Sequence, residues 1–410
     1  QYDFSLLKET AHELCCKIIS DSLPVAPAGW TTRTPAFYGI LGSKTFVMGN
    51  NGYVQHPEVA GMEADEYDKL IKDPINFIAS TVIPRMYNNL DPQKPLKMHK
   101  AYETAKAAMA EDVGKTAAYC KEFKEEFGYY KGAPLGSGGF TAAPFDYLSD
   151  QLRSFSGISL DIRRNKEKIK EACEVLLPLM FLQGMPSKPH CEGAVGMPLH
   201  MPPFMRERDF EQMWFPTFKK LLEQFAARGA RVSAFCEGDW TRYMDFLEEL
   251  PAGTKLKFEY GNPKEIKDKL GDKMIIAGLY PLNTVKTGTK EECVDKAKDL
   301  MEIMLPGCGY VFDFDKVPLT LADINLDNYI ALGEYFRDNA VFSNAGAEYG
   351  EATNVENFEK ESSIEILPCS ENDFDRATYE NENISTPNFA LSRIAEYDKA
   401  FYKFYINLLL

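Results

Sequence analysis

The sequence has few of the residues and motifs that reveal a function at first sight. Its 410 residues include only five histidines, and no CxxC motif and no run of eighteen apolar residues occur. Without such a run, no helix is expected to span a membrane. The nine cysteines are an odd number and form no framework, which indicates reduced thiols in a cytoplasm. We interpret most of them as small buried hydrophobic residues.

Positive charge is also scarce, because the formal net charge is -15. This balance argues against nucleic acid or an anionic membrane as the main partner. The first residues, "QYDFSLLKET", show neither the charged segment nor the apolar segment of a signal peptide. We therefore expect a cytoplasmic protein with a large buried core.

Between residues 213 and 340 the sequence alternates strictly between patterns typical of helices and of strands. Helices are predicted at 215–229, 241–251, 262–271, 289–304 and 321–338, and strands at 231–236, 255–259, 273–278 and 309–314. Asn262 and Thr289 are predicted helix caps, the latter in a capping box with Glu292. Such alternation with short connections indicates a parallel sheet covered by helices.

A barrel and a doubly wound sheet both fit this pattern. No GxGxxG follows a first strand, so the dinucleotide-binding version has no support, and we predict a (β/α)8 TIM barrel. Residues 1–130 are expected to form an N-terminal helical layer and residues 131–342 the main part of the barrel. Residues 343–410 are expected to form a C-terminal extension that ends in a helix, after an acidic stretch at 343–385.

Active sites of such barrels lie at the carboxyl ends of the strands. Glu237 follows a predicted strand in "FCEGDW", and Glu259, Tyr280 and Asp313 occupy corresponding positions. A carboxylate at a strand end is held rigidly and can bind zinc, so Glu237, Glu259 and Asp313 are candidate metal ligands. The alternative for each is a solvated charge or a salt bridge on the rim.

A second group of candidates surrounds His200 in "GMPLHMPPFM". The imidazole could act as a metal ligand or as a proton donor, and otherwise it is a core histidine with one hydrogen bond. Methionine and aromatic side chains suit a flat apolar ligand, and they equally fill ordinary cores. The candidate substrate-binding residues are Met197, Met201, Phe204, Tyr280 and Asn283, and His190 and Cys191 are interpreted as structural or surface residues.

Several segments together resemble the uroporphyrinogen-decarboxylase superfamily, and most closely its corrinoid-dependent methyltransferase branch. The resemblance covers roughly residues 30 to 340 and includes "PFDYLSDQLRSFSGISLDIRRN", "MPLHMPPFM", "ARVSAFCEGDW", "MIIAGLYPLNTVKTGTKEE" and "CGYVFDFD". It implies a (β/α)8 barrel and places Asp146 where the superfamily keeps a substrate-facing acid. The "EG" and "LH...FM" segments resemble enzymes that demethylate methoxylated aromatics.

The sequence also departs from the motifs of two branches of the superfamily. Uroporphyrinogen decarboxylases carry an arginine-rich "RQAGRY" signature, and "WTTRTPAFYG" is the nearest stretch here. The thiol-methylating branch has an H-x-C pair where this chain has Phe235 and Glu237. Cys308 in "PGC" lies before the predicted strand, at the wrong end of the barrel, and Lys316 falls where the zinc cysteine is expected.

The sequence therefore predicts a methyltransferase with Glu237, His200 and Asp146 as catalytic residues. It would take a methyl group from a small methoxylated substrate and pass it to the cobalt of a corrinoid on a partner protein, with zinc as a possible cofactor. A homodimer is possible. Two alternatives stay open, namely a decarboxylase of the uroporphyrinogen-decarboxylase type and a catalytically silent barrel that acts as a binding subunit.

Overall fold

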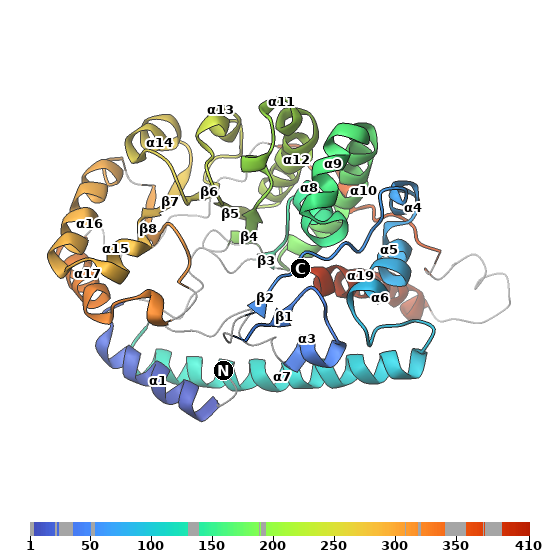
Figure 1. Cartoon of the computed structure of the whole chain (residues 1–410), viewed down its shortest axis with the longest axis horizontal. Helices are drawn as coiled ribbons and strands as arrows, with labels where there is room; N and C mark the ends of the chain where they lie inside the picture. The colour runs from blue at the N-terminus through green and yellow to red at the C-terminus, as the bar shows by residue number, and fades with distance from the viewer. Residues whose placement is uncertain are drawn as a thin grey trace.

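The structure is a computed structural model (Figure 1). It describes residues 4–20, 23, 36–50, 54–129, 139–187, 189, 194–307, 309–318, 321–340, 358–371, 373 and 388–410. His190, Cys191, Cys308 and most of the acidic stretch 343–385 lie outside the described residues.

Six parallel strands form one sheet, and each strand pairs with the next one along the chain. In Figure 1 strands β4 to β8 follow an arc, and helices α12, α13, α14, α16 and α17 lie on its outer side. A doubly wound sheet reverses its strand order at a switch point, whereas a barrel adds strands in one direction. The sequential order therefore favours the barrel, as predicted. The strands are β3 (Gly139–Phe140), β4 (Ala194–Leu199), β5 (Arg231–Cys236), β6 (Lys255–Phe258), β7 (Ile275–Tyr280) and β8 (Tyr310–Phe314).

The predicted elements between residues 213 and 340 are confirmed. Asn262 accepts hydrogen bonds from two backbone N–H groups at the start of α14, and Thr289 and Glu292 form the capping box of α16. One short helix, α15 (Leu282–Thr287), was not predicted. The helices are α12 (Phe215–Ala226), α13 (Met244–Glu248), α14 (Pro263–Leu270), α16 (Lys290–Met304) and α17 (Leu326–Asn339).

Side-chain alternation separates the two faces of the sheet. A side chain at Gly184 of α10 (Lys166–Gly184) would meet Phe225 of α12 and Val195 of β4, so Val195 faces the helices. Val195 pairs with Val232, and Ala234 pairs with Leu256, which extends this buried face across three strands. Since successive residues of a strand point to opposite faces, Phe235 and Lys257 point to the concave side of the arc.

The N-terminal part is mostly helical within the described residues, as predicted, with a small antiparallel pair of strands in addition. In Figure 1 the long helix α7 crosses below the sheet, with α1 beside it. The boundaries of the three-part division stay a prediction. The elements are α1 (Phe4–Lys17), α3 (Ala36–Leu41), β1 (Val47–Met48), β2 (Val54–Gln55), α4 (Tyr67–Lys72), α5 (Pro74–Phe77), η1 (Ile78–Val82), α6 (Ile83–Met86) and α7 (Pro95–Glu126).

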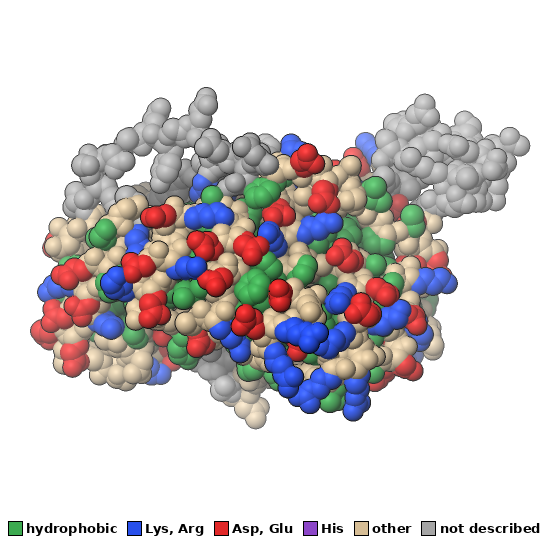
Figure 2. All heavy atoms as spheres, turned by 90° about the horizontal axis from the view of Figure 1, so that it is seen from above, with side chains coloured by type: hydrophobic (Ala, Val, Ile, Leu, Met, Phe, Trp, Pro, Cys, Tyr) green, Lys and Arg blue, Asp and Glu red, His purple; other side chains and the backbone are tan. Residues whose placement is uncertain are grey.

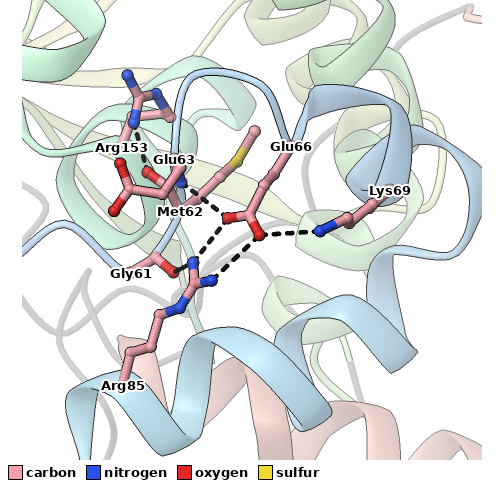
Figure 3. A network of polar contacts seen from close by, with 7 residues as sticks. All are labelled: Gly61, Met62, Glu63, Glu66, Lys69, Arg85 and Arg153. Atoms are coloured by element: carbon pink, nitrogen blue, oxygen red, sulfur yellow. Dashed lines mark hydrogen bonds and ion pairs between the residues drawn. The ribbon is translucent and has the colours of Figure 1, made fainter.

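A polar network joins this helical layer to the barrel (Figure 3). The Arg85 guanidinium donates to both carboxylate oxygens of Glu66, at 2.6 and 3.1 Å, and to the Gly61 carbonyl at 3.0 Å. Arg153 donates to the neighbouring Met62 carbonyl and to Asp161. Because Arg153 ends the π-helical segment η2 (Tyr147–Arg153), the network fixes that segment against the 61–66 loop.

The C-terminal segments return to the body of the protein. Residues 358–371 reach α12, where the Glu361 N–H donates to Gln224 and Arg228 pairs with Glu365. The terminal helix α19 (Asn388–Leu409) confirms the predicted helix. Near its end the Leu408 carbonyl accepts a hydrogen bond from the Tyr87 hydroxyl.

The surface carries both signs of charge in spite of the net charge of -15. Figure 2 shows acidic and basic side chains interspersed over one face, with hydrophobic side chains scattered between them. None of the helices in the described ranges is long and apolar enough to cross a membrane.

Candidate functional site at the carboxyl ends of β4 and β5

His200 stands immediately after β4 and joins carboxylates from two other elements. Its Nδ1 lies 2.6 Å from Asp150 Oδ2, and its Nε2 lies 3.2 Å from Glu237 Oε1. Asp150 belongs to η2, and Glu237 follows β5. An ionised carboxylate only accepts hydrogen bonds, so both ring nitrogens carry a proton when both acids are ionised. The arrangement therefore holds His200 as an imidazolium.

The charge of this imidazolium is stabilised by its neighbours. Burial lowers the pKa of His200, but the hydrogen bonds to Asp150 and Glu237 outweigh that effect and raise the pKa to about 11. The side chain is still 41% exposed, and Asp150 is the more buried of its two partners at 18%. His200 is thus positively charged at neutral pH and accessible from the Glu237 side, where Glu237 is 39% exposed.

Asp146 lies one turn before Asp150, at the end of the short helix α8 (Pro144–Asp146), and it is only 1% exposed. Its Oδ1 accepts a hydrogen bond from the Trp214 indole at 2.8 Å, and its Oδ2 accepts one from the backbone N–H of His200 at 3.1 Å. Burial and the nearby Asp150 raise the pKa of Asp146 to about 7, although the positive charge of His200 acts to lower it. The structure therefore does not present Asp146 to a substrate as the resemblance implied. Its carboxylate positions the end of β4.

Two π-helical segments deliver groups to this site. The segment η2 carries Asp150 and Ser149, whose hydroxyl donates to Asp150 Oδ1 at 2.8 Å. The segment η4 (Phe210–Trp214) carries Trp214 to Asp146. Single π-helical turns are frequent at functional sites because they change the direction of a side chain within a helix.

The turn "FCEGDW" fixes Glu237 through its glycine. Gly238 has a φ of 74°, and a Cβ there would lie 2.8 Å from Pro203. Only glycine adopts this backbone conformation without strain and tolerates that approach. The Gly238 N–H donates to Glu259 Oε2 at 2.7 Å, and the Trp240 indole donates to the Glu237 carbonyl at 2.9 Å. Glu237 is therefore a positioned carboxylate and not a freely solvated one.

The three carboxylates predicted to share a metal each have their own cation. Glu237 contacts His200, Glu259 contacts the Lys316 ammonium at 2.9 Å, and Asp313 contacts the Lys257 ammonium at 2.9 Å. Within the described residues, no group of three or more His, Cys, Asp or Glu side chains is arranged to hold a metal ion. The structure does not gather the three carboxylates around one point, because each is paired with a different cationic side chain: Lys257 of β6 for Asp313, Lys316 after β8 for Glu259, and His200 for Glu237.

The predicted substrate-binding residues fall into two sets. Met197 and Met201 are buried in the core, and the buried Tyr280 donates its hydroxyl to the Cys293 carbonyl of α16, so none of these three side chains is exposed to a substrate. Asn283 is exposed on α15. Phe204 is 70% exposed, and its ring packs edge-on against Phe155 at 5.0 Å.

This aromatic pair is close in sequence to two residues of the candidate site. Phe204 lies four residues after His200, and Phe155 lies five residues after Asp150. Of the predicted set, Phe204 is therefore the residue best placed to contact a flat substrate.

Sequence reasoning missed Asp150 and His56. The signal for Asp150 was its spacing of four from Asp146, which places two carboxylates on one side of a helical segment. His56 follows β2 and stacks on Phe46 at 4.7 Å. The pKa of His56 is lowered, chiefly by partial burial. The charge of His200 also lowers it, and the charge of Asp150 acts in the opposite direction. These influences indicate that His56 lies within electrostatic reach of the site, which local sequence could not reveal.

A family model for uroporphyrinogen decarboxylase (URO-D) matches residues 80–317, which is more than half of the chain. The chain belongs to the uroporphyrinogen decarboxylase family. The matched range contains the sheet and the groups around His200, and the family fold is the (β/α)8 barrel. Members of the URO-D superfamily are mostly enzymes, either decarboxylases or methyltransferases. No curated protein matches the chain.

Proposed function

We propose that this URO-D family member is a methyltransferase that demethylates a small methoxylated aromatic compound, with His200 as the acid. The methyl group would pass to the cobalt of a corrinoid held by a partner protein. The observation that carries the proposal is the imidazolium of His200, which Asp150 and Glu237 hold at the carboxyl end of the sheet.

An aryl methyl ether resists cleavage because a phenolate is a poor leaving group. A proton donor beside the ether oxygen removes this obstacle, since the oxygen then leaves as a phenol. Phenols of the tyrosine type have a pKa of about 10. Asp150 and Glu237 together raise the pKa of His200 to about 11, and only Asp150 remains in contact when a substrate oxygen replaces Glu237 at Nε2. The pKa of the acid then lies below about 11, which favours proton transfer to the departing oxygen.

The two carboxylates have different roles in this proposal. Asp150 is the less exposed of the two carboxylates and is close to Nδ1, so it orients the ring and retains the positive charge. Glu237 makes the longer contact on the exposed side, so a substrate oxygen could replace it at Nε2. The exposed rings of Phe204 and Phe155 would contact the aromatic ring of the substrate.

The corrinoid would supply the cobalt nucleophile that accepts the methyl group. Zinc is the second group that the resemblance implies, but the carboxylates proposed to bind it are paired with His200, Lys257 and Lys316. These residues do not fit a zinc site as they stand, and we derive no step from zinc. Metal content therefore stays a separate prediction, which elemental analysis of the purified protein would test.

Decarboxylation of a polycarboxylated tetrapyrrole is less well supported. Such a substrate needs several fixed cations, whereas the two arginines nearest to the site in the chain are occupied. Arg153 is bound to Asp161 and Met62, and Arg242 donates to the carbonyls of Pro202 and Pro203. The buried position of Asp146 also argues against an acid that contacts the substrate.

The deciding experiment compares wild type with His200→Gln on a series of methoxybenzenes whose phenols differ in acidity. With a cobalt(I) corrinoid protein as acceptor, kcat/KM should fall by roughly 10²-fold or more for the least acidic phenols. The loss should shrink as the phenol becomes more acidic, because a better leaving group needs less protonation.

His99→Gln is the matched control, since His99 is exposed on α7, outside the candidate site. Its rates should equal those of wild type. Wild-type rates for His200→Gln with every substrate would refute the acid role. A carboxylated aromatic or tetrapyrrole is assayed in parallel, and turnover of it that is independent of the corrinoid and releases carbon dioxide would favour the decarboxylase. The absence of any turnover would favour the silent binding subunit.

A further inference from the structure

A second constellation of reactive side chains lies on α1 and α7, outside the candidate site. His12 and Cys16 are four residues apart on α1, and His12 Nδ1 lies 3.8 Å from Cys16 Sγ. On its other side, His12 Nε2 lies 2.9 Å from Glu126 Oε1 at the end of α7. We call these three residues the Cys16 triad.

The two contacts of His12 determine which of its ring nitrogens carries the proton. Glu126 can only accept when ionised, so Nε2 carries the ring proton. The lone pair of neutral His12 is then on Nδ1, and the Cys16 thiol donates to it. Transfer of one proton converts this pair into a thiolate and an imidazolium, which Glu126 stabilises. A nucleophile, a base and an orienting carboxylate in this order are the arrangement that activates a thiol.

The ring of His12 is also held by packing. It lies edge-on to Phe123, in the last turn of α7, at 5.4 Å and to Phe127, the residue that follows α7, at 5.2 Å. Phe123 is fully buried in a small hydrophobic cluster with Cys15, Tyr119 and Tyr129. This cluster joins α1 to α7, so the side chains of the Cys16 triad come from two elements that are fixed to each other.

A cavity of about 530 Å³ opens beside the triad, and its lining includes Lys8, His12, Cys16, Lys17 and Phe123. This volume lies in the range of small-molecule sites. Cys16 is exposed, whereas Cys15, Cys173, Cys236 and Cys293 are buried. A small reagent in this cavity could therefore reach the Cys16 sulfur.

The charges around the cavity restrict the kind of reagent. Lys17 pairs with Glu13 at 2.5 Å, and Lys8 pairs with Glu122 at 2.6 Å. Cys120 of α7 is partly buried and packs against the hydrophobic cluster of Cys15 and Phe123. Glu9 and Glu13 line the cavity, and Glu122 and Glu126 contact the lining residues Lys8 and His12, so four carboxylates accompany two ammonium groups around it. This excess of negative charge disfavours an anionic reagent.

We propose that Cys16 is a site of thiol–disulfide exchange with small neutral or cationic disulfides, activated by His12 and Glu126. The Cys16 thiol gives its proton to His12 Nδ1, and the thiolate attacks one sulfur of the disulfide. A new S–S bond joins Cys16 to that sulfur while the original S–S bond breaks. The departing thiolate takes the proton from His12 and leaves as a thiol, so the small disulfide is the oxidant.

The test uses the full-length protein and residue-level mass spectrometry after brief treatment with cystamine or oxidised glutathione. Cys369 is the internal control, because it is an exposed free cysteine with no histidine contact among the described residues. Below the ordinary thiol pKa of about 8.5, Cys16 should react roughly tenfold faster than Cys369 with cystamine. Oxidised glutathione, which is anionic, should react more slowly with Cys16 than cystamine does.

Two carboxylate variants separate the triad from a general effect of charge. Glu126→Gln and Glu13→Gln each remove one negative charge near Cys16, which by itself favours the thiolate. Through the triad, however, Glu126→Gln weakens the imidazolium, so its Cys16 rate should fall while the rate in Glu13→Gln is unchanged or rises. His12→Gln should lower the Cys16 rate to about that of Cys369.

Equal rates and equal pH profiles for Cys16 and Cys369 would overturn the proposal. So would an unchanged Cys16 rate in His12→Gln, or a fall of the same size in both carboxylate variants. Circular dichroism of each variant would check that α1 and α7 remain folded.

Discussion

At the scale of single residues, the candidate site depends on a few positions whose chemistry is set by their contacts. His200 keeps its charge because it has a carboxylate on each ring nitrogen. Asp146 is chemically the same group as Asp150, yet it is buried beneath the site and contacts Trp214. Two carboxylates four residues apart therefore have different roles, since one faces indole and backbone donors and the other faces the imidazole.

The turn after β5 gives a test at a single glycine. Gly238→Ala should lower the free energy of unfolding by about 1–3 kcal/mol, because φ is positive and the new Cβ would contact Pro203. The displaced turn should also lower demethylation by moving Glu237. Gly253→Ala is the control, since Gly253 also has a φ of 74° but the nearest atom to its Cβ is 3.5 Å away. Equal activity in the two variants would contradict the positional role of Gly238.

The raised pKa of Asp146 predicts a pH-dependent stability. The folded protein binds this proton up to about pH 7, whereas the unfolded chain releases it near the ordinary value of 3.8. The free energy of unfolding of wild type should therefore fall between these values as pH rises, by at most about 1.4 kcal/mol per pH unit. Asp146→Asn should lack this component. Parallel pH profiles of the two proteins in urea unfolding would contradict the assignment.

At the scale of elements, the π-helical segment η2 connects the N-terminal layer with the site. Asp150 contacts His200 from its middle, and Arg153 at its end donates to the Met62 carbonyl. Arg85 binds Glu66 and so holds the same 61–66 loop from the other side (Figure 3). The position of a catalytic partner therefore depends on contacts with a layer that is distant in sequence.

Glu66→Gln tests this connection. Glu66 is only 5% exposed, so the loss of its charge should lower the free energy of unfolding by about 1–3 kcal/mol at neutral pH. The hydrogen bond from Arg85 lowers the pKa of Glu66 from 4.5 to about 2, so this stabilisation should disappear as pH falls through that interval.

The exposed pair of Glu111 and Lys115 on α7 provides the control for that experiment. Glu111→Gln should leave the stability almost unchanged, because solvent screens an ion pair that is fully exposed. An equally small effect of Glu66→Gln, measured by chemical denaturation, would mean that the Arg85–Glu66 pair does not stabilise the 61–66 loop to which Arg153 binds.

At the scale of the whole molecule, the end of the chain packs against its N-terminal part. Leu408, Leu409 and Leu410 are buried, and the Leu408 carbonyl accepts from Tyr87. Tyr102 of α7 packs against Phe404 of α19 with ring centroids 4.3 Å apart. The helical layer and the C-terminal extension therefore stabilise each other.

Leu409→Ala should cost about 2–4 kcal/mol, because Leu409 is fully buried and the substitution leaves a cavity. Phe401→Ala on the same helix is the control, since Phe401 is 60% exposed, and its effect should be below about 1 kcal/mol. Similar melting temperatures for the two variants would show that α19 is not part of the cooperative core.

The sequence by itself determined the alternating elements and the strand ends. Periodicity and caps such as Asn262 and Thr289 act over a few residues, so β5, β6 and their helices were predictable. The same reasoning located Glu237 and His200, because side chains that follow parallel strands meet at one edge of a sheet.

Only the tertiary structure decided which of these groups interact. Asp150 and His200 are 50 residues apart in sequence, and His200 and Glu237 are 37 apart, so no local pattern specifies their contacts. The lysines that pair with Glu259 and Asp313 likewise come from other strand ends. The sequence shows which charges the chain carries, and the packing of distant strands decides which charges neutralise one another and which remain available for chemistry.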